Sequence, residues 1–202
     1  MEAQEDKMIL LAIYGSPREN GNTDLMMDSF LDGALSAANF ELQKIYIRDL
    51  SISGCRSCGY CDEHGTCVQK DDMQMVYPFF DKAERIVIAS PIYFYGLSGQ
   101  AKLLVDRSQA TYVRRHKRKA EANTPATPVG RKGFFLCAGA TRGKKLFDGA
   151  ILTVRYFFDA IGVEYAGEAC FSGIDEKGAI RSNPTALEEC RRAGMAFATD
   201  GL

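Results

Sequence analysis

Hydrophobic residues in this chain gather in short runs that are separated by longer amphipathic stretches. Four runs are continuously apolar, which is typical of strands buried on both faces of a sheet. A fifth run alternates with polar residues, which is typical of an edge strand. The alternating run is 42–48, and the four continuous runs are residues 8–14, 85–90, 132–138 and 163–171.

Between these runs, apolar residues recur every three or four positions, and this spacing predicts helices. The predicted helices are residues 23–38, 98–112, 144–161 and a last one that opens at Asn183 and Pro184. Asn22 is the expected cap of the first helix, and Gly162 is the expected end of the third. Residues 72–84 form a less regular helix, in which Asp72 is the expected cap and Pro78 is expected to kink or end it.

Strand and helix alternate five times, which is the order of a mostly parallel sheet with helices on both faces. Right-handed crossovers leave few topologies, and the expected strand order is 2-1-3-4-5. The 202 residues fit a single domain, 1–202. Within it, 49–71 is a cysteine-rich segment, and the loop-like composition around 121–133 places a surface excursion at 113–131.

Composition narrows the classes of partner. The net charge of −1 argues against nucleic acid and against a charged membrane surface. The acidic start of the chain does not have the pattern of a signal peptide, and the longest apolar runs are too short to span a bilayer. We therefore expect a cytoplasmic protein. In that compartment, clustered cysteines more often hold metal or do redox chemistry than form disulfides.

The segment GSPRENGNT (15–23) follows the first strand and precedes the first helix, at the edge where parallel sheets bind ligands. Its candidate anion-binding side chains are Ser16, Arg18, Asn22 and Thr23. The segment matches neither the dinucleotide fingerprint nor the P-loop. Because side-chain donors dominate, a terminal phosphate monoester is the expected ligand. The alternative is an ordinary polar turn that caps a helix.

A second loop, SPIYFYGLSG (90–99), follows the third strand at the same edge. Its aromatic residues Tyr93, Phe94 and Tyr95 are costly to expose unless something flat covers them. The two loops are expected to face each other across one crevice. A mononucleotide with a large ring needs both a phosphate cradle and a flat apolar slot, and FMN fits that description. The alternative is that the aromatic residues only cap the core.

The segment GCRSCGYCDEHGTC (54–67) places four of the seven cysteines in a C-x2-C-x2-C-x5-C pattern after the second strand. Four thiolates from one compact loop are sufficient for a four-iron cluster. Zinc is one competitor, with His64 as a possible substitute ligand, although structural zinc sites usually use two separated cysteine pairs. Redox-active thiols or disulfides are another. The remaining cysteines, Cys137, Cys170 and Cys190, are expected to be small core residues.

Taken together, GSPRENGNT and SPIYFYGLSGQAKLLVDR resemble the NAD(P)H-dependent FMN reductase group of flavodoxin-like proteins. The intervening CRSCGYCDEHGTCVQKDDM is similar to the iron–sulfur flavoproteins within that group. The resemblance runs from about residue 8 to residue 165. It implies a flavodoxin-like three-layer sandwich, bound FMN and a [4Fe-4S] cluster. It also implies a homo-oligomer, a dimer or tetramer, in which a cluster lies near a neighbouring subunit's flavin.

The resemblance also implies roles for individual residues. Phosphate contacts come from Ser16, Arg18, Asn22 and Thr23, ring contacts from Pro91, Ile92, Tyr93, Phe94 and Gly96, and cluster ligation from Cys55, Cys58, Cys61 and Cys67. Pro78 is a departure from the pattern. No protein acid, base or nucleophile is expected, because the cofactors would carry the chemistry.

The expected function is an FMN-dependent oxidoreductase that passes electrons between NAD(P)H, or a ferredoxin-type carrier, and an unidentified acceptor. One alternative is an NAD(P)H-dependent FMN or quinone reductase without a cluster. Another is a zinc-clipped interaction module that is not an enzyme. The basic run RRHKRK (114–119) is expected to be a solvated helix end. Docking of an acidic electron carrier, or contact with the extra phosphate of NADPH, is its functional alternative.

Overall fold

The computed structural model describes the backbone of residues 7–122 and 130–201, together with their side chains other than those of 118–122. Five parallel strands form one sheet in the order β2-β1-β3-β4-β5, which confirms the predicted topology. The strands are β1 (Ile9–Tyr14), β2 (Glu41–Tyr46), β3 (Arg85–Pro91), β4 (Lys132–Gly139) and β5 (Glu164–Ser172).

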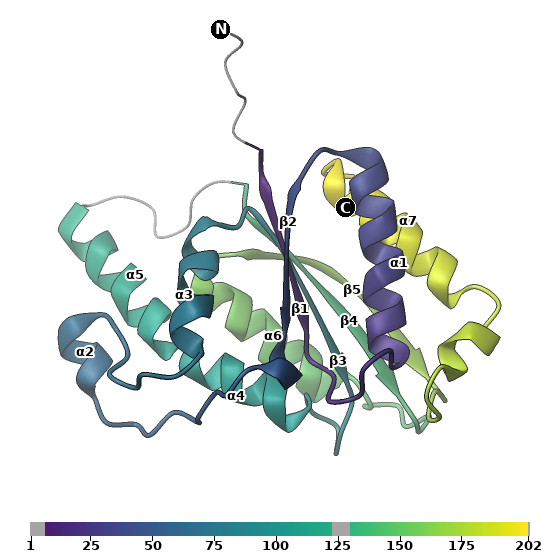
Figure 1. Cartoon of the computed structure of the whole chain (residues 1–202), viewed down its shortest axis with the longest axis horizontal. Coiled ribbons are helices and arrows are strands. Elements are labelled where there is room, and N and C mark those ends of the chain that lie inside the picture. The colour runs from purple at the N-terminus through teal and green to yellow at the C-terminus, as the bar shows by residue number, and fades with distance from the viewer. Residues whose placement is uncertain (1–6, 123–129, 202) are drawn as a thin grey trace, which may run out of the picture.

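Helices cover both faces of the sheet, so the fold is a flavodoxin-like three-layer sandwich, as predicted (Figure 1). One face carries α1 (Asn22–Ala37) and α7 (Ala186–Ala198). The other carries α3 (Met73–Lys82), α4 (Gly99–Arg107), α5 (Gln109–Ala122) and α6 (Asp148–Ile161). The short helix α2 (Tyr60–His64) lies against α5, and two single turns are η1 (Ile47–Asp49) and η2 (Ala179–Ser182).

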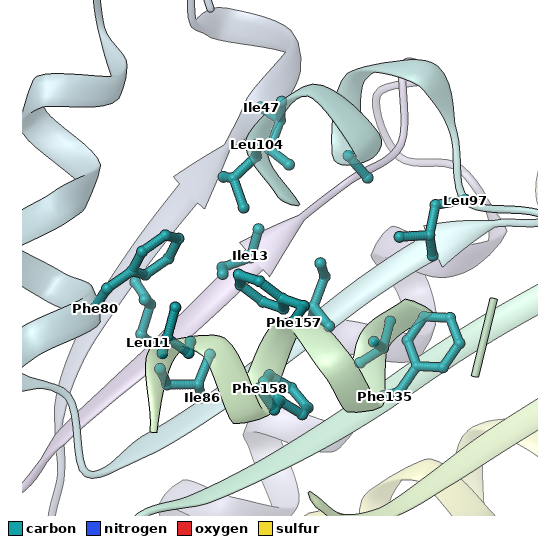
Figure 2. Packing of buried hydrophobic residues seen from close by; sticks show 14 of the residues in the cluster. Leu11, Ile13, Ile47, Phe80, Ile86, Leu97, Leu104, Phe135, Phe157 and Phe158 are labelled. Carbon is teal, nitrogen blue, oxygen red and sulfur yellow. The ribbon is translucent and has the colours of Figure 1, made fainter. Parts of the chain in front are cut away.

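Alternate side chains of the buried strands supply two separate cores, which is why those strands are apolar at nearly every position. Figure 2 shows the core beneath α3, α4 and α6. There, Leu11 and Ile13 of β1 pack with Phe80 of α3 and with Phe157 and Phe158 of α6. The Phe80 and Phe157 rings meet edge to face, with centroids 5.5 Å apart. This core holds α4 against the sheet. The last turn of α4 lines one candidate site, and Ser98, the residue that caps its start, joins the loops of the other.

Three predicted helices differ from the structure. The last helix, α7, begins at Ala186 and not at Asn183 and Pro184. The helix expected at 98–112 is two helices, α4 and α5, that meet at Ser108. Because α5 continues to Ala122, residues 113–122 of the expected surface excursion are helical. Residues 123–129 of that excursion, and residues 1–6 of the acidic start, lie outside the described residues. Helix α3 does not end at Pro78, since it runs on to Lys82. No helix in the described parts of the chain is long and apolar enough to cross a membrane.

The structure places Gly162 and Asp72 at the predicted helix ends, whereas Asn22 is not the cap of its helix. Gly162 ends α6 in the left-handed conformation, with φ of 69°. Asn22 is the first residue of α1 and does not cap it, because its side chain binds a distant loop instead. Asp72 stands at the start of α3, but its carboxylate accepts a hydrogen bond from the Ser51 amide at 2.7 Å. For both Asn22 and Asp72, the side chain binds a long-range partner in place of the helix's own amides.

Helices α1 and α7 approach each other through glycine. A Cβ added at Gly194 would overlap the carbonyl oxygen of Phe30, and one added at Gly33 would overlap the carbonyl oxygen of Arg191. Both obstacles are backbone atoms of helices, which do not move aside easily. The contact brings Phe30 against Phe197, with ring centroids 5.5 Å apart. Glycine at these positions therefore sets the distance between the two helices.

We predict that Gly194→Ala lowers the free energy of unfolding by about 2 kcal/mol, because the overlap outweighs the gain in helix propensity. Gly99→Ala is the matched control, since among the described atoms none lies within 4 Å of a Cβ added there. Urea denaturation measures both variants. Equal unfolding midpoints for the two variants would contradict the close approach of α1 and α7.

Candidate functional site

The two loops predicted to face each other are joined by a buried hydroxyl. Ser98 Oγ donates to the carbonyl oxygen of Gly15 at 2.5 Å and accepts from the Ala101 amide at 3.1 Å. The Ser98 amide in turn donates to Ser90 Oγ at 3.0 Å. The loop after β1, the end of β3 and the start of α4 are thus held together. This arrangement places both loops at the carboxyl edge of the sheet, as parallel pairing requires.

One cavity of about 150 Å³ opens between these loops. It is lined by seven of the nine predicted cofactor residues, namely Ser16, Arg18, Asn22, Thr23, Pro91, Ile92 and Tyr93. Phe94 and Gly96 are not among the residues that line it. Sequence reasoning missed Gly21, Ala138, Ala140, Asp175 and Lys177. Ala138 is the second-last residue of β4 and Ala140 directly follows that strand, whereas Asp175 and Lys177 carried no recognisable motif.

Thr23 is the second residue of α1, and its side-chain hydroxyl is a candidate ligand-binding group. It is 1% exposed, and in the described part of the chain its Oγ1 has no hydrogen-bond partner. A buried hydroxyl without a partner costs free energy, so it is a candidate to bind something that enters the cavity. The adjacent N–H groups of a helix start favour an anion there.

Asn22 and Arg18 make different contacts from Thr23. Asn22 Nδ2 donates to the carbonyl oxygen of Glu176 at 2.8 Å, and its Oδ1 accepts from the Ile180 amide at 3.1 Å. Arg18 Nη1 donates to the carbonyl oxygen of Asp175 at 3.4 Å. Both side chains therefore hold the loop that follows β5 over the phosphate loop, and their own contact with a phosphate stays a prediction.

The aromatic loop after β3 ends in a tight turn with unusual backbone angles. Tyr93 and Gly96 exchange two backbone hydrogen bonds of 3.0 Å. Phe94 and Tyr95 between them have φ of 49° and 64°, the left-handed pair of a type I′ turn. Non-glycine residues in this region cost about 1–3 kcal/mol each and cluster at functional sites. The Phe94 side chain is fully exposed, so this strained turn presents an uncovered aromatic ring.

The four cysteines of the predicted cluster motif line a second cavity, of about 450 Å³. They are Cys55, Cys58, Cys61 and Cys67. Left-handed residues on both sides of α2, Gly59 with φ of 73° and Gly65 with φ of 67°, allow the chain to turn around this space. The far wall is the junction of α4 and α5, which includes Arg107 and Ala110. All four thiols therefore share one hollow.

Arg107 ties the two ends of the cysteine segment together. Its guanidinium donates to both carboxylate oxygens of Asp71, at 2.6 and 3.0 Å, and to the carbonyl oxygen of Ser53 at 2.8 Å. Asp71 also accepts from the Ser53 amide at 3.0 Å. The Arg107 side chain is 1% exposed, and its Nε finds no partner among the described residues. A buried cation with one free N–H thus stands in the wall of the cysteine cavity.

Two side chains of the basic run, those of Arg114 and Lys117, donate hydrogen bonds to the C-terminal end of α2. Arg114 Nη1 donates to the carbonyl oxygen of Gly65 at 3.4 Å, and Lys117 Nζ donates to that of Glu63 at 2.7 Å. Arg114 also pairs with Asp81 at 2.8 Å. Cations at the C-terminal end of a helix are favourable because its last carbonyl groups lack partners. The expectation of a solvated helix end is therefore wrong for Arg114 and Lys117.

The geometry of the cysteine cavity differs from that of a single-ion site. Across the described residues, no three His, Cys, Asp or Glu side chains lie close enough to hold one metal ion. His64 stacks on Tyr60, with ring centroids 4.0 Å apart, and its Nδ1 lies 3.0 Å from the Tyr60 carbonyl oxygen. Burial, helped by the charge of Asp62, raises the pKa of Cys61, so a ligand that binds this sulfur must displace a proton.

Comparison with known proteins gives consistent matches. Residues 8–144 match the family described as NADPH-dependent FMN reductase. An iron–sulfur flavoprotein of Archaeoglobus fulgidus is 36% identical over 100 residues, which is 50% of this chain and 45% of that protein. One of Methanocaldococcus jannaschii is 30% identical over 154 residues, or 75% and 71% of the two chains. A solved flavone reductase superposes with a TM-score of 0.70 at 18% identity, covering 95% of this chain and 62% of that one.

The matches to the curated relatives are partial. For three of the iron–sulfur flavoproteins the match covers 45%, 65% and 52% of their own length, so the chain spans about half to two thirds of each. The matched family region contains both loops of the first cavity and all four cysteines of the second.

We predict that Asp71→Asn destabilises the protein by about 3 kcal/mol, because it leaves the Arg107 guanidinium buried without its charge partner. Asp81→Asn is the matched control, since it breaks a more exposed pair with Arg114 and should cost less than about 1 kcal/mol. Denaturant unfolding at pH 7 measures both. Equal losses for the two variants would contradict the anchoring role of Arg107.

Asp71→Asn also tests how the free energy of unfolding depends on pH. Burial raises the pKa of Asp71, but its hydrogen bonds from Arg107 and Ser53 outweigh burial, and the pKa lies below its usual value. A lowered folded-state pKa means that the stabilisation is present above the unfolded-state pKa of about 3.9 and is lost as the pH falls through the folded-state value. The stability difference between the wild type and Asp71→Asn should therefore shrink below about pH 4. A difference that stays constant down to pH 3 would rule out this linkage.

Proposed function

The chain belongs to the NADPH-dependent FMN reductase family, and from that premise we propose that it is a flavin-dependent oxidoreductase that binds FMN and a [4Fe-4S] cluster. The observation that carries the proposal is the position of α4. Ser98, the residue that caps its start, joins the two loops that line the FMN-type cavity, and its last residue, Arg107, lines the cysteine cavity. Nine residues at a rise of 1.5 Å separate the two ends by roughly 13 Å. One rigid helix thus spans the distance between the two candidate cofactor sites.

The first cavity supports FMN bound by its phosphate end. At about 150 Å³ it is smaller than the 300–1,000 Å³ of typical whole-ligand pockets, so it suits the phosphate and the adjoining chain. The unpartnered Thr23 hydroxyl and the helix N-terminus are the donors for that phosphate. The ring would then lie outside the cavity, against the exposed aromatic turn around Tyr93, where a flat group covers costly apolar surface.

The second cavity supports a cluster more than a single zinc ion. Structural zinc sites usually use two separated cysteine pairs, whereas the four thiols here come from one compact C-x2-C-x2-C-x5-C segment and line one hollow. The unpartnered Nε–H of Arg107 fits an anionic, sulfur-rich group, because hydrogen bonds to cluster sulfurs are a usual means of tuning such groups. Cys55, Cys58, Cys61 and Cys67 would be the ligands.

The roles of the residues follow from these positions. When bound, FMN and the cluster would supply the conversion between two-electron and one-electron transfer. Thr23 binds and orients the flavin phosphate, and Arg107 holds the cysteine segment closed at both ends. NAD(P)H or a ferredoxin-type carrier is the proposed electron donor. A homo-oligomer, dimer or tetramer, is proposed because no described residue covers the ring of Phe94, and a neighbouring subunit would cover the part of this turn that the flavin leaves exposed.

We predict that Thr23→Val weakens FMN binding by about tenfold or more, because a hydrogen bond to a charged phosphate is lost while the shape is kept. Riboflavin, which lacks the phosphate, should bind the variant and the wild type equally. Thr111→Val is the matched control, because Thr111 Oγ1 is also buried and unpartnered within the described residues but does not line this cavity. Fluorescence titration measures all the affinities. Unchanged FMN affinity in Thr23→Val would place the phosphate elsewhere.

We predict that Cys58→Ala protein, prepared without oxygen, loses iron and acid-labile sulfide but keeps FMN. Electron transfer from reduced flavin to a one-electron acceptor should then fall, because the cluster is no longer on the path. Cys190→Ala is the matched control, since Cys190 is buried in α7 and lies outside the motif. If iron content and the rate match those of the wild type, the protein is a cluster-free FMN or quinone reductase instead.

A further inference from the structure

Two cysteines outside the cluster motif meet across neighbouring strands. Cys137 of β4 and Cys170 of β5 are register partners in the parallel sheet. Their sulfur atoms lie 2.9 Å apart, and the Cys137 thiol donates to Cys170 Sγ. This separation is shorter than the van der Waals contact of two sulfur atoms. The pair is separated by 33 positions in the sequence, which hid it from sequence reasoning.

The backbone around this pair has the dimensions that a disulfide needs. Neighbouring strands lie about 4.8 Å apart, which is within the range of 4.4–6.8 Å found between the Cα atoms of disulfide-bonded cysteines. Closing the bond therefore requires the sulfur atoms to approach each other by somewhat less than 1 Å, with no large movement of the strands.

The two thiols differ in access. Cys137 is fully buried in the core under α6, whereas Cys170 is half-buried on the edge strand β5. Burial, with the neighbouring Cys170 thiol, raises the pKa of Cys137 well above its usual value. Cys170 is therefore the thiol that a small oxidant reaches first, and Cys137 is a protected partner within bonding distance. A partly accessible thiol beside a resolving thiol is the arrangement of redox-sensitive cysteines.

We propose that Cys137 and Cys170 are a reversible redox modification site that a peroxide converts into a cross-strand disulfide. With hydrogen peroxide, the O–O bond breaks as one oxygen passes to the Cys170 sulfur, which becomes a sulfenic acid, and the other oxygen leaves as water. The Cys137 sulfur then attacks the sulfenic sulfur, the S–S bond forms and a second water leaves. Two thiol protons end in water, and two electrons pass to the peroxide. A dithiol reductant reverses the change.

The position of the pair suggests what the disulfide does. Strand β5 is one of the two edge strands, and it leads directly into the loop that Asn22 and Arg18 hold over the phosphate cavity. That loop starts with the Gly173 amide bound to the Thr141 carbonyl oxygen at 3.3 Å and the Ile174 amide bound to the Gly139 carbonyl oxygen at 3.0 Å. A disulfide just before it ties the base of this loop covalently to β4.

The test is peroxide treatment of the full-length protein, followed by alkylation of free thiols, tryptic digestion and mass spectrometry without reduction. Peptides 133–142 and 156–177 carry Cys137 and Cys170, and separate peptides carry the motif cysteines and Cys190. We expect 133–142 and 156–177 to become one linked species, two hydrogen masses lighter than their sum. Free Cys170 should fall by roughly tenfold, and dithiothreitol should restore it.

Cys190 is the internal control, because burial raises its pKa to about 12 and its thiol has no partner among the described cysteines within bonding distance. It should stay alkylatable after a denaturing quench. In Cys137→Ala the sulfenic acid on Cys170 should persist and react with dimedone. The proposal is overturned if Cys170 is oxidised without linking to 133–142, or if it links to a motif cysteine. These outcomes do not depend on FMN or on a cluster, so they are distinct from a failure of the proposed function.

Discussion

Parallel pairing of all five strands is the constraint on which the candidate sites depend. Because every strand runs the same way, the segments that follow β1, β2, β3 and β4 all leave from one edge of the sheet. The phosphate loop and the aromatic turn meet there through the buried Ser98 hydroxyl. The cysteine segment leaves from the same edge and folds back along α4. The topology of the sheet therefore brings the segments of both candidate sites to one edge of it.

A second level of organisation comes from buried cations. Arg107 closes the cysteine segment by binding Asp71 and the Ser53 carbonyl group. Arg131 is also buried and donates to the Phe80 and Ile161 carbonyl oxygens at the ends of α3 and α6. Each guanidinium satisfies backbone groups that its neighbours leave unpaired. The ends of α3 and α6 and the long cysteine segment are thereby held in place by hydrogen bonds from buried side chains.

The sequence was sufficient for the features that depend on local pattern. Four continuous apolar runs and one alternating run predicted the five strands, and their alternation with helices predicted the order of the sheet. Ser16 and Thr23 were found because they follow a strand and precede a helix. The local sequence pattern did not predict the break between α4 and α5 at Ser108 or the left-handed backbone angles at Phe94. Both depend on how the surrounding loops and helices pack.

The sequence pattern also did not predict which residues far apart in the chain contact each other. Asn22 was expected to act on its own helix, yet it binds a loop more than 150 positions away. The basic run was expected to face solvent, yet two of its side chains hold α2. Cys137 and Cys170 were expected to be isolated core residues, and only the register of β4 and β5 brings them together. In each case the partner is set by tertiary structure, which residue spacing does not encode.

The central claim is that one sheet edge and one helix serve both a flavin and an iron–sulfur group. The most direct test is a visible spectrum of protein purified without oxygen, before and after dithionite, with FMN, iron and sulfide counted per chain. The account predicts one FMN with four irons and four sulfides, as the four thiols of the second cavity require. One zinc ion without iron, or a preparation that lacks flavin absorbance, would contradict it.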